Sequence, residues 1–204
     1  MIYWHISEWI KRLFPDLIWD IRTADKKLYL TFDDGPTPDI TDKILEILDH
    51  YNARATFFCL GRNVEHYPEI YQRIIQKNHR IGNHTYSHLK GWKTSHKEYF
   101  QDIELAHQFI KSDLFRPPYG QIRRSQIEYL KKRYKIIMWE VMSHDYQTLV
   151  SKERSLKAVF RHAREGSIIV FHDSMKASEK VLYILPKVLE EFSNKGFTFE
   201  VIDG

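Results

Sequence analysis

The chain has 204 residues, of which 43% are hydrophobic and 14% aromatic, a composition that fits one globular domain with a sizeable core. The formal charge of +4 comes from Lys and Arg residues that are dispersed among acids, which fits an anionic polymer weakly and gives no indication of nucleic-acid binding. A single cysteine, Cys59, excludes an intrachain disulfide.

The first 26 residues are apolar and aromatic but are interrupted by charges. No uninterrupted apolar stretch of roughly 7 to 15 residues precedes a small-residue cleavage site, and none reaches the roughly 18 residues of a membrane span. We therefore expect a cytoplasmic protein. One helical stripe is formed by Ile2, Ile6, Trp9, Ile10, Leu13 and Phe14. We expect residues 1–26 to pack on the body of the domain, although the stripe also suits a membrane surface.

From residue 27 onward, short apolar runs alternate with amphipathic segments. The runs predict strands at 27–32, 55–60, 80–83, 114–116, 135–141, 167–171 and 197–202. The amphipathic segments predict helices at 40–51, 67–78, 97–112, 124–133, 153–164 and 178–195. This alternation predicts a single α/β domain over 27–204, with a largely parallel sheet that is either a barrel or open. In both architectures the functional site collects at the carboxyl ends of the strands.

Two adjacent acids, Asp33 and Asp34, follow the first of these strands in the stretch LYLTFDDGPTPDIT, where a Gly-Pro step turns the chain. A capping role for the next helix suits them less well, because Asp39 and Thr41 lie closer to it. Their position at the carboxyl end of a strand is where catalytic residues are expected in such a sheet.

Two histidines, His84 and His88, are separated by four residues in GNHTYSHLKGW. This spacing predicts two imidazoles on one face of a helical turn, within reach of one ion. One carboxylate from the Asp33–Asp34 step completes a two-His-one-Asp set with open positions for water and substrate, as a catalytic zinc requires. The other acid then remains free to act as a base.

Two further stretches carry polar residues at predicted strand ends. LFRPPYG places Arg116 before two prolines, which hold the loop stiff and extended. GSIIVFHDS places His172 at the carboxyl end of another strand. Taken singly, Arg116 also suits a surface ion pair, and His172 a capping or core role. Four such stretches together predict one active site.

The stretches TFDDGP, HTYSH, RPPYG and IIVFHD, in this order, closely resemble the motifs of the polysaccharide deacetylases, the NodB-homology carbohydrate esterases. The resemblance covers about residues 27–202. It implies a deformed (β/α) barrel with about seven parallel strands that holds Zn²⁺ or another divalent ion such as Co²⁺, Ni²⁺ or Mn²⁺. It also implies removal of acetyl groups, mainly N-acetyl from N-acetylglucosamine-type units, from a sugar polymer or oligomer.

By the same resemblance, Asp33 is the catalytic base, and Asp34, His84 and His88 are the metal ligands. Arg116 matches the arginine that orients the base and would keep its carboxylate ionised. Such a base takes the proton of the water that attacks the acetamide carbonyl.

The resemblance also implies that the backbone N–H of Tyr119 helps to hold the oxyanion and that His172 is the general acid. A protonated imidazole delivers the proton without which C–N cleavage would expel an unstable amide anion. No covalent intermediate is needed.

One stretch, MWEVMSHDYQT, departs from the family pattern. Met142 stands where the fourth motif usually has an aspartate that tunes the acidic histidine. Asp145 aligns with a second acid of that motif and is a candidate substitute, while Tyr146 replaces a tryptophan of the sugar groove. Val170 takes the place of a leucine that lines the acetyl pocket.

Other functions stay open at this point. A hydrolase of another non-peptide C–N bond would have a site closed by loops, whereas the short loops here favour an open groove. A catalytically weak sugar-binding relative would lack ligands or the base, and here those positions are filled. Aromatic side chains that can stack on sugar rings are Trp92, Tyr119, Tyr146 and Trp139, although Trp139 is expected in the core. We expect a monomer.

Overall fold

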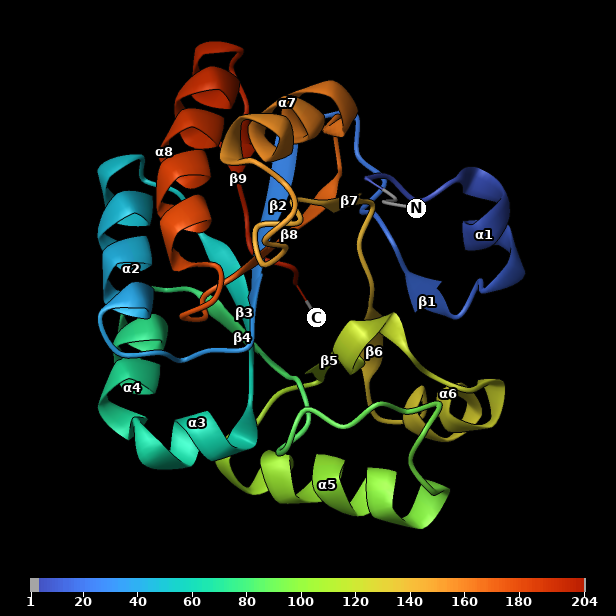
Figure 1. The fold of residues 1–204 in the computed structure, drawn as a ribbon. Coiled ribbons are helices and arrows are strands. Elements are labelled where there is room, and N and C mark those ends of the chain that lie inside the picture. The colour runs from blue at the N-terminus through green and yellow to red at the C-terminus, as the bar shows by residue number, and fades with distance from the viewer. Residues whose placement is uncertain (1–3, 204) are drawn as a thin grey trace.

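The structure, a computed structural model, describes residues 4–203. It has a curled parallel sheet with helices around its outer face (Figure 1). The strands are β1 (Leu17–Ile18), β2 (Lys27–Asp33), β3 (Ala55–Cys59), β4 (Arg80–Asn83), β5 (Leu114–Phe115), β6 (Lys135–Ile137), β7 (Val141–Met142), β8 (Ile168–His172) and β9 (Thr198–Phe199). Their order is β1-β6-β5-β4-β3-β2-β8-β7, and β9 pairs with the start of β2. The expected deformed barrel of parallel strands is confirmed.

The helices are α1 (Glu8–Leu13), α2 (Ile40–His50), α3 (Gly61–His66), α4 (Pro68–Gln76), α5 (His96–Phe109), α6 (Arg124–Leu130), α7 (Lys152–His162) and α8 (Ser178–Asn194), with a 3-10 turn η1 (Pro118–Gly120). The six predicted helices are present with slightly shorter bounds. Neither α3 nor β1 was predicted. The prediction of one strand at 135–141 is wrong, because the chain forms two strands here. β6 pairs with β5 and β1, whereas β7 pairs with β8.

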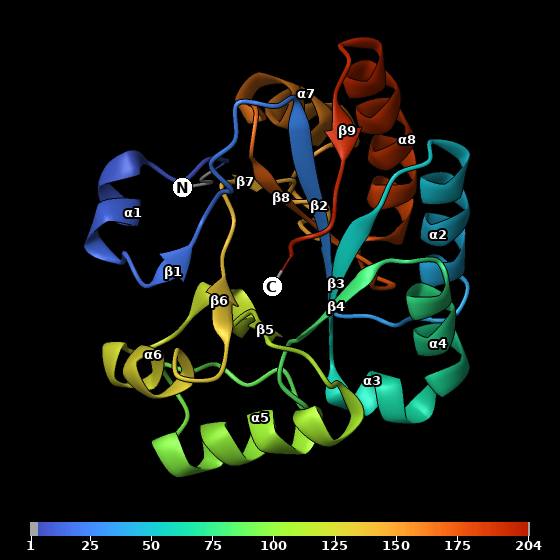
Figure 2. The same cartoon turned by 180° about the vertical axis from the view of Figure 1, so that it is seen from behind.

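Three buried clusters position the site. The largest lies between the sheet and α2, α7 and α8, and includes Phe32, Phe57 and Phe171, whose rings stack in a row. The second joins the N-terminal segment to α5 and α6. The third fills the concave interior of the sheet. In Figure 2 the chain's C-terminal residues run into this interior, where Ile202 is buried and its N–H donates to Thr56 Oγ1 at 3.0 Å.

The N-terminal segment contacts both edges of the sheet. β1 extends one edge by pairing with β6, and His5 forms an antiparallel bridge with Val141 at the other edge. Among the residues of the apolar stripe, Ile6, Ile10 and Phe14 pack on the second cluster. Trp9 and Leu13 are 64% and 51% exposed, and Ile2 lies outside the described residues. No helix within residues 4–203 combines the length and the apolar character of a membrane span.

A buried ion cluster, which the sequence patterns did not predict, fixes this segment. Lys11 Nζ lies 2.7 Å from Glu140 Oε1 and 2.6 Å from Asp20 Oδ2, and Arg164 also pairs with Glu140. Glu140 is fully buried and accepts a hydrogen bond from Ser167 Oγ. Burial would raise the pKa of Glu140, but these cations and the hydroxyl lower it to about 2. Because the Lys11 ammonium lies between these carboxylates, where a metal ion would have to bind, the group is an ion-pair network rather than a metal site.

Candidate active site

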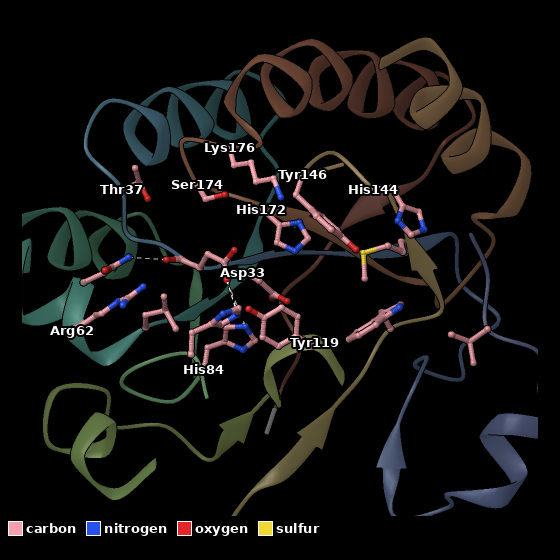
Figure 3. A pocket seen from close by; sticks show the side chains of 17 residues that line it. Asp33, Thr37, Arg62, His84, Tyr119, His144, Tyr146, His172, Ser174 and Lys176 are labelled. Carbon is pink, nitrogen blue, oxygen red and sulfur yellow. Dashed lines mark hydrogen bonds and ion pairs between the residues drawn. The ribbon is translucent and has the colours of Figure 1, made fainter. Parts of the chain in front are cut away.

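A cavity of about 680 Å³ lies at the carboxyl ends of the central strands. Its lining includes most of the residues expected from the sequence, namely Asp33, Asp34, His84, His88, Tyr119, Tyr146 and His172. In Figure 3, His84 and His172 project into the cavity from opposite sides, with Asp33 between them. The sheet therefore brings the end of β2, the loop after β4 and the end of β8 to one place.

Asp34, His84 and His88 form a group that can hold a metal ion. Their nearest ligand atoms all lie within 4.8 Å of one another. Asp34 Oδ1 is 3.1 Å from His88 Nε2 and 3.8 Å from His84 Nε2. His84 Nδ1 lies 2.8 Å from the carbonyl oxygen of Arg116, to which it can donate, and this leaves Nε2 as the free ligand atom.

The prediction that a helical turn places the two histidines together is wrong. Both lie in the loop after β4, where Thr85 and His88 have positive φ angles of 66° and 63°. Asn83 Oδ1 accepts the Thr85 N–H at 2.8 Å, and Thr85 Oγ1 accepts the His88 N–H at 3.0 Å. These side-chain acceptors replace helical hydrogen bonds and fold the loop so that the two rings are 5.1 Å apart between centroids.

The donor set fits a divalent ion. Asp34 Oδ1 is buried and lies against the imidazoles of His84 and His88, with no hydrogen bond from any other described residue. Burial lowers the pKa of His84 to about 4, so its Nε2 lone pair is available at neutral pH. Burial alone would raise the pKa of Asp34, but the hydrogen bond with His88 and the neighbouring imidazoles hold it below its ordinary value. One carboxylate and two imidazoles, with room left for water and substrate, are ligands that Zn²⁺ accepts.

The two adjacent acids are separated by the backbone. Asp33 is the last residue of β2, whereas Asp34 leaves the strand with a φ of 84°. Asn63 in α3 donates to the Asp34 carbonyl at 2.7 Å. The N–H of the next residue, Gly35, donates to Asp173 Oδ1 at 2.9 Å. Hydrogen bonds therefore hold the backbone of both Asp34 and Gly35 in the turn.

Asp173 is a site-supporting residue to which the sequence analysis gave no role. It is fully buried, and its Oδ2 accepts a hydrogen bond from Thr41 Oγ1 at 2.7 Å. Burial raises the pKa of Asp173 to about 7. A Cβ atom at Gly35 would lie 1.8 Å from this carboxylate, so only glycine fits there. The signal available in the sequence was its position directly after His172 at a strand end.

Asp33 is held by Arg116. Arg116 Nη1 lies 2.7 Å from Asp33 Oδ1, and the guanidinium is fully buried. Its other N–H groups donate to Thr31 Oγ1, Met138 O and Ile137 O at 2.7, 2.8 and 3.2 Å. Because every branch of the guanidinium is held, Arg116 fixes the carboxylate of Asp33 in place.

His172 is oriented by Asp145. Their Nδ1 and Oδ1 atoms are 2.8 Å apart, and Asp145 Oδ2 accepts the His172 backbone N–H, also at 2.8 Å. Burial would lower the pKa of His172, but the Asp145 carboxylate outweighs it and raises the pKa to about 9. The imidazole is therefore protonated at neutral pH. Met142 lines the cavity, and the acid partner comes from the loop that follows it.

The remaining predicted residues occupy different positions. Tyr146 lies with its ring centroid 4.7 Å from that of His172, and Tyr119 lies 4.6 Å from His88. Val170, expected to line the acetyl pocket, is fully buried and is not among the residues that line the cavity. Trp92 is 57% exposed, and its indole N–H donates to Ile122 O outside the cavity.

Trp139 lines the cavity and also packs, partly buried, against the second and third clusters, so the core position that the sequence favoured is confirmed in part. It lies between β6 and β7, at the point where the chain changes its partner strand. The sequence analysis also gave no role to several other lining residues, which are Thr37, Arg62, Asn63, Ser174 and Lys176. No motif or period marks these side chains, because they come from loops and from the short helix α3.

Comparison with known proteins places this geometry in a family. The family model described as polysaccharide deacetylase matches residues 20–134. A peptidoglycan-N-acetylglucosamine deacetylase of Bacillus cereus is 30% identical over 192 residues, which are 90% of each chain. The peptidoglycan-N-acetylmuramic acid deacetylase PdaC of Bacillus subtilis is 32% identical over 181 residues, and the match spans 84% of this chain but 37% of the relative.

Solved structures agree with this comparison. The crystal structure of the Bc1960 peptidoglycan N-acetylglucosamine deacetylase, in complex with an N-hydroxybenzamide derivative, superimposes with a TM-score of 0.88. It is 30% identical in sequence, and the match covers 98% of this chain and 95% of the other. The whole curled sheet, including the N-terminal segment, therefore has a counterpart in a solved structure.

Proposed function

Because the chain belongs to the polysaccharide deacetylase family, we propose that it is a metal-dependent hydrolase that removes N-acetyl groups from N-acetylglucosamine-type units of a glycan. The observation that carries this proposal is the arrangement of three groups in one cavity. A carboxylate held by an arginine (Asp33) and an imidazole held by a carboxylate (His172) both lie beside the group Asp34, His84 and His88.

The proposed ion is Zn²⁺ or another divalent metal, held by Asp34, His84 and His88. When bound there, such an ion polarises the acetyl carbonyl and lowers the pKa of the attacking water. The hydrogen bond from His84 to the Arg116 carbonyl fixes the tautomer that binds. Asn63 supports the same group by holding the backbone of Asp34.

Asp33 is proposed as the base that accepts the proton of the attacking water. Its carboxylate is buried and is held by Arg116 at 2.7 Å, so it needs no reorientation when the water is deprotonated. Arg116 also keeps the carboxylate oxygen that it contacts from rotating away. The tetrahedral oxyanion is then stabilised in part by the backbone N–H of Tyr119, in the rigid turn η1.

His172 is proposed as the acid that protonates the leaving amine. With a pKa of about 9 it carries the proton at neutral pH, and Asp145 holds Nδ1 so that Nε2 is the donating atom. Tyr146 and Tyr119 offer ring surface at the cavity for sugar stacking. The order of events needs no covalent bond to the protein.

The test is acetate release from a panel of glycans: N-acetylglucosamine oligomers, peptidoglycan fragments and acetylated xylan. We expect acetate from the amino-sugar substrates, its loss after chelation, and its return when Zn²⁺ or Co²⁺ is added back. Acetate from xylan alone would replace the N-acetyl assignment by an O-acetyl one. Absence of acetate from every substrate, with bound metal present, would contradict the proposal and favour a sugar-binding role.

A further inference from the structure

Two exposed cations, Arg62 and Lys176, border the cavity and have no part in the chemistry proposed above. Arg62 lies in α3, directly before Asn63, and Lys176 follows β8, four residues after His172. In Figure 3, Arg62 lies on the Thr37 side of the catalytic residues, and Lys176 lies close to His172 and Tyr146. A substrate in the cavity would therefore meet a cation on two sides.

Neither cation has an ion-pair partner within residues 4–203. Lys176 Nζ lies 5.7 Å from the Tyr146 ring centroid, which keeps it over the cavity. Some other surface arginines are paired with acids, as Arg73 is with Asp42, whereas Arg161 on α7 has no such partner among the described residues. An unpaired surface cation is usually only solvated. Arg62 is of interest because it lies on the wall of the cavity.

The acids of the cavity are already engaged. Asp33 is neutralised by the buried Arg116, and Asp34 lies against the two imidazoles. No lining carboxylate is therefore left to balance Arg62 and Lys176. Arg116 balances Asp33 and Asp145 balances His172, so Arg62 and Lys176 give the cavity an excess of positive charge, which raises the affinity for an anion.

The lining is also asymmetric. Ile6, Met142 and Trp139, from the N-terminal segment and from the chain around β7, are apolar. Hydroxyl groups of Thr37 and Ser174 lie with the cations among the polar lining residues. A hydroxyl and a cation together suit a carboxylate, whereas an apolar wall suits a sugar face or a methyl group.

We propose that Arg62 and Lys176 are specificity-determining residues that favour an acidic amino-sugar glycan over a neutral glycan of the same backbone. The inference rests on the proposed function and refines its substrate class. A β-linked strand in which every second unit carries a lactyl carboxylate, as in peptide-free peptidoglycan, has this chemistry. A chitin oligomer of equal length has the same linkage and acetamides without the carboxylates.

The experiment compares kcat/KM for acetate release from chitotetraose, from a peptide-free peptidoglycan tetrasaccharide, and from the same tetrasaccharide with its carboxylates methyl-esterified. The wild-type enzyme should prefer the acidic substrate, and esterification or high salt should remove the preference. In Arg62→Gln and Lys176→Gln the acidic-to-neutral ratio should fall about threefold to fivefold each, and about tenfold or more in the double variant.

The matched controls are Arg161→Gln and Lys157→Gln, which remove the same charges from exposed positions on α7 that do not line the cavity. These controls should keep the wild-type ratio. A wild-type ratio near one, or a ratio that changes equally in the controls, overturns the assignment of Arg62 and Lys176. In both cases acetate release from chitotetraose leaves the proposed function standing, whereas no acetate from any of the three substrates contradicts the proposed function itself.

Discussion

The pairing of His172 with Asp145 predicts a large effect of Asp145→Asn on the pH dependence of activity. The asparagine keeps an oxygen that can accept the backbone N–H of His172 but removes the negative charge. Without that charge the pKa of His172 should fall from about 9 to its ordinary value of 6.5 or lower, because burial then acts unopposed. At pH 8 the protonated fraction would fall from about nine-tenths to about three-hundredths, a loss of activity of about 30-fold.

The assay is a pH titration of kcat/KM for the wild type and Asp145→Asn, in which the alkaline limb reports the protonated histidine. We expect the limb to move down by about 2.5 pH units, with little change below pH 6. A bound divalent ion adds positive charge beside His172 and lowers the limb in both proteins, so the difference between them is the quantity to measure. An alkaline limb at the same pH in both proteins would show that His172 is not the titrating acid.

The same shift has a consequence for stability. The folded-state pKa of about 9 lies above the unfolded value of 6.5, so the pair stabilises the fold fully below pH 6.5 and loses this contribution as the pH rises through 9. A shift of this size corresponds to about 3 kcal/mol. Urea denaturation at pH 6 and pH 9.5 should show a smaller decrease in Asp145→Asn than in the wild type; equal decreases would contradict the pairing.

Three other outcomes are expected. His88→Ala should lose the bound metal and the activity while its circular dichroism spectrum stays that of the wild type, because His88 is not in the core; stoichiometric metal in the purified variant would refute the ligand assignment. Asp33→Asn should keep its metal but lose turnover by about 10²-fold or more, since the amide cannot accept the proton of the water; loss of metal instead would make it a ligand. Lys11→Ala should lower the free energy of unfolding in urea by about 2 kcal/mol or more because Glu140 stays buried with fewer cations, whereas Lys131→Ala, which removes an exposed lysine, should change it little.

The motifs at strand ends were predictable because they combine two signals. A buried apolar run marks the strand, and polar residues directly after it mark the carboxyl end, as in β2 with Asp33 and β8 with His172. In a parallel sheet these ends meet at one edge, so the positions of Asp33 and His172 in the chain were enough to bring them together. The register confirms this closeness, since Asp33 is directly opposite His172 in the β2–β8 pair.

Other features depend on contacts that a hydrophobic pattern does not contain. Residues 135–141 are a nearly continuous apolar run, and nothing in the run shows that its hydrogen-bond partners change after Ile137. For the same reason the run did not show that Trp139, at the change of partner, lines the cavity as well as packing on the core. The spacing of His84 and His88 is equally compatible with a helix and with a loop, and the choice depends on the side-chain acceptors Asn83 and Thr85.

The departure from the family pattern that the sequence predicts at Met142 also has a structural reading. The imidazole of His172 needs one carboxylate at Nδ1, and Asp145 provides it. The loop holds this acid in place, because the Tyr146 N–H donates to Asp145 Oδ1 at 3.0 Å and Ser143 Oγ accepts the Asp145 N–H at 3.3 Å. A second acid at position 142 is therefore unnecessary for the proton. Because Met142 lines the cavity, its apolar side chain acts instead on the surface that a substrate meets, so substitutions there should alter KM among glycans more than the alkaline limb.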